Sequence, residues 1–221
     1  NDDNSVAIAA AGGVEALVAL ARAGNEAQKE RAAGALWNLS YNDDNRVAIA
    51  AAGGVEVLVS LARDGNEMQK EEAAGALWNL VINDDNKRAI VAAGGIEVLI
   101  ALARDGNERQ KERAAGALRS LAMRNDNRVA IAAAGGVEVL VSLARDGNEG
   151  QKDCAAGALW CLADNDDNKA AIVAAGGIEV LIALARDGNE AQKERAAGTL
   201  WNLSDNDDSS VAIAAAGGIE V

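Results

Sequence analysis

Asparagine side chains recur at one position of this 221-residue chain, at a spacing of 41 residues or a multiple of it. A carboxamide offers both a donor and an acceptor, so it can pair with the backbone of a peptide of any sequence. The position is filled by Asn38, Asn79, Ser120, Cys161 and Asn202, and we call this set the asparagine row. We expect Asn38, Asn79, Asn202 and Ser120 to bind a peptide, although Ser120 and Cys161 interrupt the series of amides. The alternative is that each asparagine bonds to a neighbouring helix or faces water.

A tryptophan row and an acidic row follow the same spacing. The tryptophan row is Trp37, Trp78, Arg119, Trp160 and Trp201, and the acidic row is Glu30, Glu71, Glu112, Asp153 and Glu194. Indoles can form apolar walls for a ligand, and a carboxylate beside an indole can bind lysine or arginine by charge and cation–π contact. Two alternatives stay open. The indoles pack against a glycine of a neighbouring repeat, and the carboxylates are satisfied in solvent by lysines and arginines beside them.

Catalytic and metal-binding chemistry is poorly represented in the sequence. The chain has no histidine and two cysteines, and its Asn-Asp-Asp-Asn clusters lack the alternating ligands and final glutamate of a calcium loop. Those clusters are better explained as helix caps. The glycine pairs lack the lysine and hydroxyl residue of a phosphate-binding loop. No segment combines a nucleophile with a base, so we predict no enzyme activity, no cofactor and no metal site.

Charge and hydropathy narrow the range of partners. The net charge of −13 argues against nucleic acid, because phosphate binding needs a clustered basic face, and it favours a basic partner. Cys154 and Cys161 lie in one predicted helix about 10 Å apart along its axis, beyond disulfide reach. Free thiols are typical of a reducing compartment. No apolar run reaches the roughly 20 residues of a membrane span and no signal sequence opens the chain, so we expect a soluble protein of the cytoplasm or nucleus.

Glycine pairs define the period of the chain. They occur at 12–13, 53–54, 94–95, 135–136, 176–177 and 217–218, always 41 residues apart. A fixed period of this size is the signature of a solenoid, in which each repeat buries its apolar face against its neighbours. We expect one continuous array over residues 1–221, with repeats at 1–41, 42–82, 83–123, 124–164 and 165–205 and a partial repeat at 206–221. Neither end has the polar face of a capping repeat, so we interpret the chain as a piece of a longer array or an engineered sequence.

Each repeat is expected to contain three helices, which in the second repeat run over about residues 45–52, 55–63 and 67–80. The glycine pair separates the first two, because glycine adopts the left-handed conformation that ends helices. Asn66 is the expected N-cap of the third helix, with Gln69 as its capping-box partner. Proline is absent from the chain, so glycine and Asn or Asp caps provide the helix boundaries.

A helical wheel of the third helix separates a core stripe from the three rows. In the first repeat Ala32, Ala33, Leu36 and Leu39 fall within about 60° of one direction, and we expect them in the core. The first members of the three rows fall between about 100° and 200° from that direction. The rows therefore share the side of the helix that faces away from the core.

The repeat resembles the armadillo repeat. Residues 45–62 read NRVAIAAAGGVEVLVSLA and residues 69–80 read QKEEAAGALWNL, while AAGALWNLS at residues 32–40 is similar to plant Arabidillo-type armadillo proteins. The resemblance extends throughout the chain and implies an all-α, right-handed solenoid of three-helix repeats whose third helices line a concave groove. It also implies that the asparagine row holds the backbone of an extended peptide. One departure is a glutamate after each glycine pair, where the family often has proline; an acidic residue suits the first turn of a helix.

These features predict a non-catalytic protein–protein interaction scaffold that binds an extended, basic peptide segment in the groove. Repeats that are two apart are the most alike, which gives a super-period of 82 residues and indicates little discrimination along most of the groove. Specificity is expected at two exposed positions of the repeat whose residue varies from one repeat to the next. The first position holds Ala27, Met68, Arg109, Gly150 and Ala191, and the second holds Tyr41, Ile82, Met123, Asp164 and Asp205. The alternative function is a structural array that stacks end to end without a dedicated peptide ligand.

Overall fold

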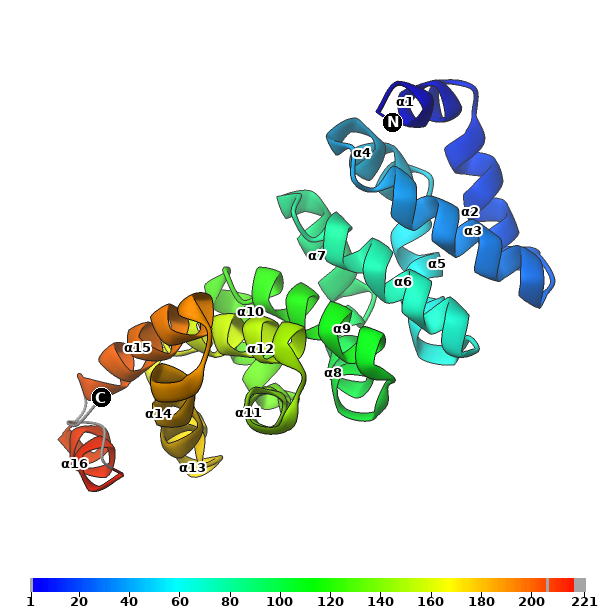
Figure 1. The fold of residues 1–221 in the computed structure, drawn as a ribbon. Coiled ribbons are helices and arrows are strands. Elements are labelled where there is room, and N and C mark those ends of the chain that lie inside the picture. Colours follow the sequence, from blue (N-terminus) through cyan, green and yellow to red (C-terminus); the bar gives the residue numbers. More distant parts are fainter. Residues whose placement is uncertain (1, 206, 217–221) are drawn as a thin grey trace. The chain divides into compact units, whose positions relative to one another are not determined.

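The computed structural model describes residues 2–205 and 207–216, and all regular secondary structure in them is α-helical, as predicted (Figure 1). The chain clusters into two compact units, residues 1–117 and 118–221, which are described separately. The sixth glycine pair and the glutamate that follows it lie outside the described residues.

Three helices of increasing length recur in each repeat. The first unit contains α1 (Asp2–Ala10), α2 (Gly13–Ala23), α3 (Glu26–Leu39), α4 (Asp43–Ala51), α5 (Gly54–Asp64), α6 (Glu67–Leu80), α7 (Asp84–Ala92), α8 (Gly95–Asp105) and most of α9 (Glu108–Leu121). The second contains the end of α9, α10 (Asn125–Ala133), α11 (Gly136–Asp146), α12 (Glu149–Leu162), α13 (Asp166–Ala174), α14 (Gly177–Asp187), α15 (Glu190–Ser204) and α16 (Asp207–Ala215). In the second repeat the three helices have 9, 11 and 14 residues.

The glycine pair turns the chain sharply between the first and second helices. α4 and α5 meet at 83°. Gly53 has a φ of 75°, in the left-handed region that residues with a side chain disfavour. A Cβ on Gly54 would lie 2.7 Å from the carbonyl oxygen of Ile49, so this position also excludes a side chain. The first glycine thus supplies a backbone conformation and the second permits a close approach.

Capping residues begin the third helix and tie it to the preceding repeat. The backbone N–H of Gln69 donates to Oδ1 of Asn66 at 2.9 Å, and the N–H of Asn66 donates to Oε1 of Gln69 at 3.3 Å. This confirms the predicted capping box. The amide of Gln69 also donates to the carbonyl oxygen of Glu26, 3.0 Å away in the preceding repeat. One buried glutamine therefore serves both its own helix and the junction between repeats.

The short first helix begins slightly before the expected position. α4 starts at Asp43 because Asn42 is its N-cap, whose side chain accepts a bond from the N–H of Asn45 at 3.1 Å. In the fourth repeat Arg124 occupies the N-cap position of α10 and makes no side-chain capping bond. The N-terminus of α10 therefore lacks the side-chain capping bond that α4, α7 and α13 have.

Small aliphatic side chains form the core. The predicted core residues Ala32, Ala33, Leu36 and Leu39 are all buried, the last being the most exposed at 5%. Within the first unit α3 packs against α6, and within the second α12 packs against α15 (Figure 1). Because α3 and α6 present the same side to the core, their rows follow one another from repeat to repeat, and the same holds for α12 and α15.

Candidate functional site

Residues of the tryptophan row pack against a glycine in the third helix of the following repeat. A Cβ on Gly75 would lie only 2.9 Å from Cε2 of Trp37, so the ring occupies the space that a side chain would need. The same relationship joins Trp78 to Gly116, Arg119 to Gly157 and Trp160 to Gly198. Packing between repeats, one of the two expected roles of this row, is thus present in the structure.

Each indole nevertheless stays at least partly accessible. Trp37 and Trp78 are half-buried, whereas Trp160 is 38% and Trp201 is 74% exposed. The guanidinium of Arg113 lies over the Trp37 ring, with Cζ 4.0 Å from the ring centroid. A cation–π contact thus forms at Trp37 within the protein itself, and the predicted contact with a ligand cation stays a prediction.

Amides of the asparagine row differ in their partners. Asn79 donates through Nδ2 to Oγ of Ser40 at 3.0 Å, and Asn202 donates through Nδ2 to Oδ1 of Asp164 at 2.9 Å. Both partners belong to the preceding repeat. Asn38 is exposed, and its side chain makes no hydrogen bond to any residue that the structure describes. Bonding through Nδ2 leaves Oδ1 as an acceptor for a ligand N–H.

Two members of the asparagine row lack an amide. Ser120 and Cys161 are both half-buried. Cys161 is a free cysteine, as predicted, and burial raises the pKa of its thiol, so the group is neutral at pH 7. A serine hydroxyl can still bind a peptide group, whereas a thiol is only a weak donor and behaves as a small apolar group.

The acidic row contains two carboxylates that are paired within the protein. Glu71 is 5% exposed and forms ion pairs with Arg109 at 3.2 Å and Arg113 at 3.5 Å. Asp153 forms an ion pair with Arg195 at 2.9 Å. These arginines come from the third helix of the next repeat. The alternative for this row, in which the cations lie beside the carboxylates in the same helix, is therefore wrong for Glu71 and Asp153.

Every second carboxylate of the acidic row is unpaired. Glu30 and Glu112 are partly exposed and Glu194 is exposed, and none of the three forms an ion pair with a described residue. The alternation follows the 82-residue super-period of the sequence. Carboxylates able to meet a ligand cation thus occur in the first, third and fifth repeats.

Glu72 is an additional carboxylate that the sequence analysis did not single out. Its Oε2 atom is buried and has no hydrogen-bond partner among the described residues. Burial raises the pKa of this carboxyl above its ordinary value of 4.5, Arg113 opposes the rise, and Glu71 and Glu30 add to it. The sequence marks Glu72 as unusual, because a carboxylate stands where the first, third and fifth repeats have a cation: Arg31, Arg113 and Arg195.

The repeat sequences decide the family. A model of the armadillo/β-catenin-like repeat matches residues 1–41, 42–82, 83–123 and 165–205. The chain belongs to the armadillo repeat family. Each match is one repeat long, which confirms the predicted period of an armadillo array.

Solved structures with the armadillo fold include engineered proteins. One crystal structure of an engineered protein is 38% identical over 100% of the chain with a TM-score of 0.93, and the chain spans only 55% of that protein. A second engineered protein is 37% identical over 94% of the chain and 86% of its own length, with a TM-score of 0.87. A designed armadillo repeat protein in complex with the peptide (KR)4 is 25% identical over 92% of the chain and 87% of its own length, with a TM-score of 0.83. No curated protein sequence matches the chain.

The acidic clusters between armadillo repeats act as helix caps. Asn42, Asn83 and Asn165 each accept a bond from the N–H three residues later, which confirms the predicted capping role. Within residues 2–205 and 207–216, no group of three or more Cys, Asp or Glu side chains is arranged to hold a metal ion. In the same part of the chain no single helix is long and apolar enough to cross a membrane, although four bent helix pairs meet those two criteria jointly.

Surface cavities of two kinds accompany the repeats. Three lie between the second helices of successive armadillo repeats and measure about 350, 340 and 240 Å³; the middle one is lined by Arg63, Lys70 and Glu97 among others. A fourth, of about 300 Å³, lies beside α12 and is lined by Met123, Arg128, Trp160, Cys161 and Asp164. Of these four cavities, the fourth alone includes residues of the tryptophan and asparagine rows.

Proposed function

We propose that this armadillo array is a non-catalytic protein–protein interaction scaffold that binds an extended, basic peptide along its third helices. The observation that carries the proposal is the set of unpaired, partly or fully exposed carboxylates at Glu30, Glu112 and Glu194. Lysine or arginine side chains of a bound segment would pair with them. The designed relative in complex with (KR)4 supports this ligand class, and the net charge of −13 is consistent with it.

Spacing sets where the basic residues of the ligand should fall. Packed helices lie about 8–10 Å apart and an extended chain advances about 3.3 Å per residue, so each repeat addresses two or three ligand residues. Arg113 and Arg195 already pair with the acids of the second and fourth repeats. We therefore expect ligand cations about five or six residues apart, matched to alternate repeats.

The two other rows would hold the rest of the peptide. Asn38 has no partner within the described part of the protein and would bond to a ligand peptide unit through both halves of its amide. Asn79 and Asn202 would contribute their Oδ1 acceptors, and Ser120 its hydroxyl. The exposed parts of the indoles would form apolar walls. The finer likeness to Arabidillo-type repeats stays a prediction from the sequence motif.

A titration with fluorescently labelled (KR)4 tests the proposal, with (SQ)4 as the uncharged control peptide. We expect saturable binding of (KR)4, weaker at high salt, and little binding of (SQ)4. The triple variant Glu30→Gln, Glu112→Gln, Glu194→Gln should weaken binding about tenfold, since each exposed pair contributes up to about 1 kcal/mol. The matched control Glu15→Gln, Glu56→Gln, Glu138→Gln changes the net charge equally at exposed positions of the second helices and should have a much smaller effect.

Asn38→Ala supplies the test of backbone recognition. Because Asn38 makes no hydrogen bond within the described part of the protein, its loss should weaken peptide binding without changing the free energy of unfolding. Equal affinity of the two triple variants, or indifference to Asn38→Ala, would count against the proposed groove. An average molecular mass from light scattering that rises with protein concentration, in the absence of peptide, would instead favour the end-to-end array.

A further inference from the structure

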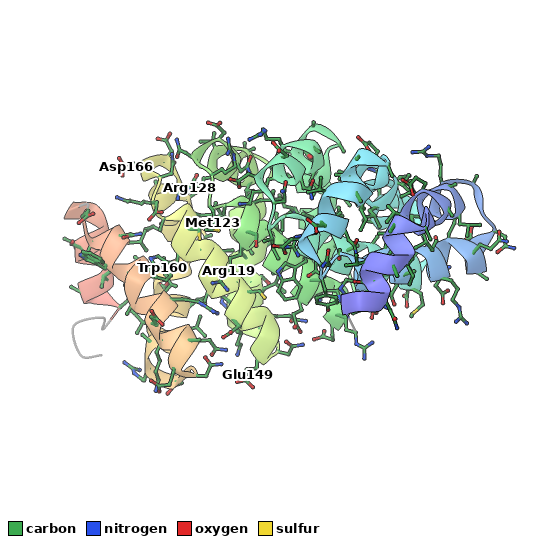
Figure 2. The ribbon with its side chains drawn as sticks, turned by 90° about the horizontal axis from the view of Figure 1, so that it is seen from above. Arg119, Met123, Arg128, Glu149, Trp160 and Asp166 are labelled. Carbon is green, nitrogen blue, oxygen red and sulfur yellow. The ribbon has the colours of Figure 1, made fainter. Side chains whose placement is uncertain are left out.

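The cavity beside α12 lies where the asparagine row loses its amide. Met123 follows α9, Arg128 lies in α10, and Trp160 and Cys161 lie near the end of α12, with Asp164 just beyond it. Figure 2 shows Met123 and Arg128 close to Trp160, at the opposite end of α12 from Glu149. At about 300 Å³, the cavity is at the lower limit of small-ligand sites and suits a single side chain.

Three of the five residues that line the cavity are apolar: Met123, Trp160 and Cys161. Met123 is 66% exposed and Trp160 is 38% exposed, both high values for large apolar side chains. Cys161 stands where Asn38, Asn79 and Asn202 stand in other repeats, and it replaces a polar amide by a small, soft, apolar group. At this repeat the row therefore cannot hold a peptide backbone, but it can accept an apolar side chain.

The charged residues at the cavity are already satisfied within the protein. Oδ2 of Asp164 accepts a bond from Arg128 at 2.7 Å, and Oδ1 accepts one from Asn202 at 2.9 Å. Because Arg128 already balances the negative charge of Asp164, this carboxylate attracts a ligand cation only weakly.

The nearby rows disfavour a cation as well. Asp153, the member of the acidic row in this repeat, is paired with Arg195. Arg119 is exposed and has no carboxylate partner within the described residues, so it would repel a ligand cation. Of the side chains that a bound segment can offer, an uncharged apolar one suits this position best.

We propose that the cavity formed by Met123, Trp160, Cys161 and the Arg128–Asp164 pair receives an apolar side chain of leucine or methionine size from the peptide bound along the third helices. This inference rests on the proposed peptide-binding function and adds a specificity subsite to it. The subsite distinguishes the fourth repeat, where cysteine fills the asparagine row, from the first, second and fifth repeats, where asparagine fills it. A preferred ligand is thus basic with one apolar residue, not uniformly basic.

Two labelled peptides test the subsite: a lysine and arginine peptide with a single leucine, and the same peptide with serine in its place. The leucine peptide should bind about fivefold to tenfold more tightly, because part of its side chain leaves water. Saturating leucine peptide should also slow alkylation of the Cys161 thiol, followed by mass spectrometry of the labelled fragment so that Cys154 is scored separately. Met123→Ala should remove most of the leucine preference, whereas the control Val47→Ala, which shortens an exposed apolar side chain of the first helix α4, should preserve it.

The outcomes separate the subsite from the groove. Equal affinity for the two peptides, with Cys161 alkylated at the same rate in the bound and unbound protein, would overturn the subsite and leave the groove intact. Failure of both peptides to bind would overturn the groove and the subsite together. Alkylation of Cys161 that slows with rising protein concentration alone would show a second copy of the chain in the cavity, and would also overturn the assignment.

Discussion

The indole of Trp37 lies against Gly75 in the third helix of the following repeat, at a distance that leaves no room for a Cβ. This contact explains a glycine in the middle of a helix, where glycine is less favourable than alanine by about 1 kcal/mol. A bulky ring in one repeat and a missing side chain in the next form a matched pair. The repeats are therefore joined by a specific shape as well as by general apolar burial.

Replacing these glycines by alanine should have opposite effects at different repeats. In Gly75→Ala the new Cβ would meet the rigid Trp37 ring at 2.9 Å, and we expect a loss of about 1–2 kcal/mol in the free energy of unfolding. In Gly34→Ala the nearest atoms belong to Glu72 at 3.6 Å, an ordinary contact, so higher helix propensity should add about 0.5–1 kcal/mol. Urea denaturation measures both, and a change of the same sign in the two variants would contradict the shape-matching argument.

Removing Arg113 should destabilise the protein far more than removing Arg109. Both pair with Glu71, but the Arg113 side chain is 11% exposed and the Arg109 side chain is 75% exposed. Arg113→Ala leaves the buried Glu71 carboxylate with the exposed Arg109 as its one ion-pair partner and a 3.3 Å hydrogen bond from Asn107. It also takes the cation from the Trp37 ring, and together these losses should lower the free energy of unfolding by about 3 kcal/mol. Arg109→Ala should lower it by less than about 1 kcal/mol. If urea denaturation gives equal losses for the two variants, Glu71 does not depend on its buried partner.

The uncapped helix α10 offers a stabilising substitution. Arg124 occupies the N-cap position with extended backbone but contributes no side-chain bond, whereas asparagine fills the same position in the second, third and fifth repeats. Arg124→Asn should restore the bond to the N–H three residues later and raise the free energy of unfolding by about 1 kcal/mol. Arg124→Ala, which removes the same side chain without adding a cap, is the control and should bring no such gain. Thermal unfolding of both variants checks the prediction.

Features that depend on a single repeat were predictable from the sequence. The period, the three helices, the Asn66 capping box and the core stripe through Leu36 follow from local preferences and helical spacing, and the structure confirms them. The start of the first helix was placed about two residues late, because two asparagines flank the acidic cluster and either can serve as a cap.

Contacts between repeats could not be derived in the same way. A helical wheel places Trp37 and Glu71 on the exposed side of their helices, but their partners depend on how the next helix is rotated and displaced. From the sequence it is consequently open whether the indole meets a glycine, and of the two readings of the acidic row, the one with an internal partner places that partner in the same helix as Glu71, although Arg113 comes from the next repeat. The second role of Gln69, which bonds to Glu26 across the junction, was missed for the same reason.

Glu72 should make stability depend on pH in the direction opposite to a paired carboxylate. Its folded-state pKa is raised, chiefly by burial, so the native state holds this proton more tightly than the unfolded chain. The stabilising contribution is complete below the ordinary pKa of 4.5 and is lost as the pH rises through the folded-state value. Glu72→Gln, which cannot ionise, should therefore be more stable than the parent protein at neutral pH, and the difference should shrink as the pH falls toward 4.5.

Urea denaturation of the two proteins across this range measures the difference directly, with the exposed substitution Glu56→Gln as the control. A Glu72→Gln protein that is less stable at neutral pH, or a difference that does not change with pH, would show that the buried Oε2 atom has a partner which satisfies its charge.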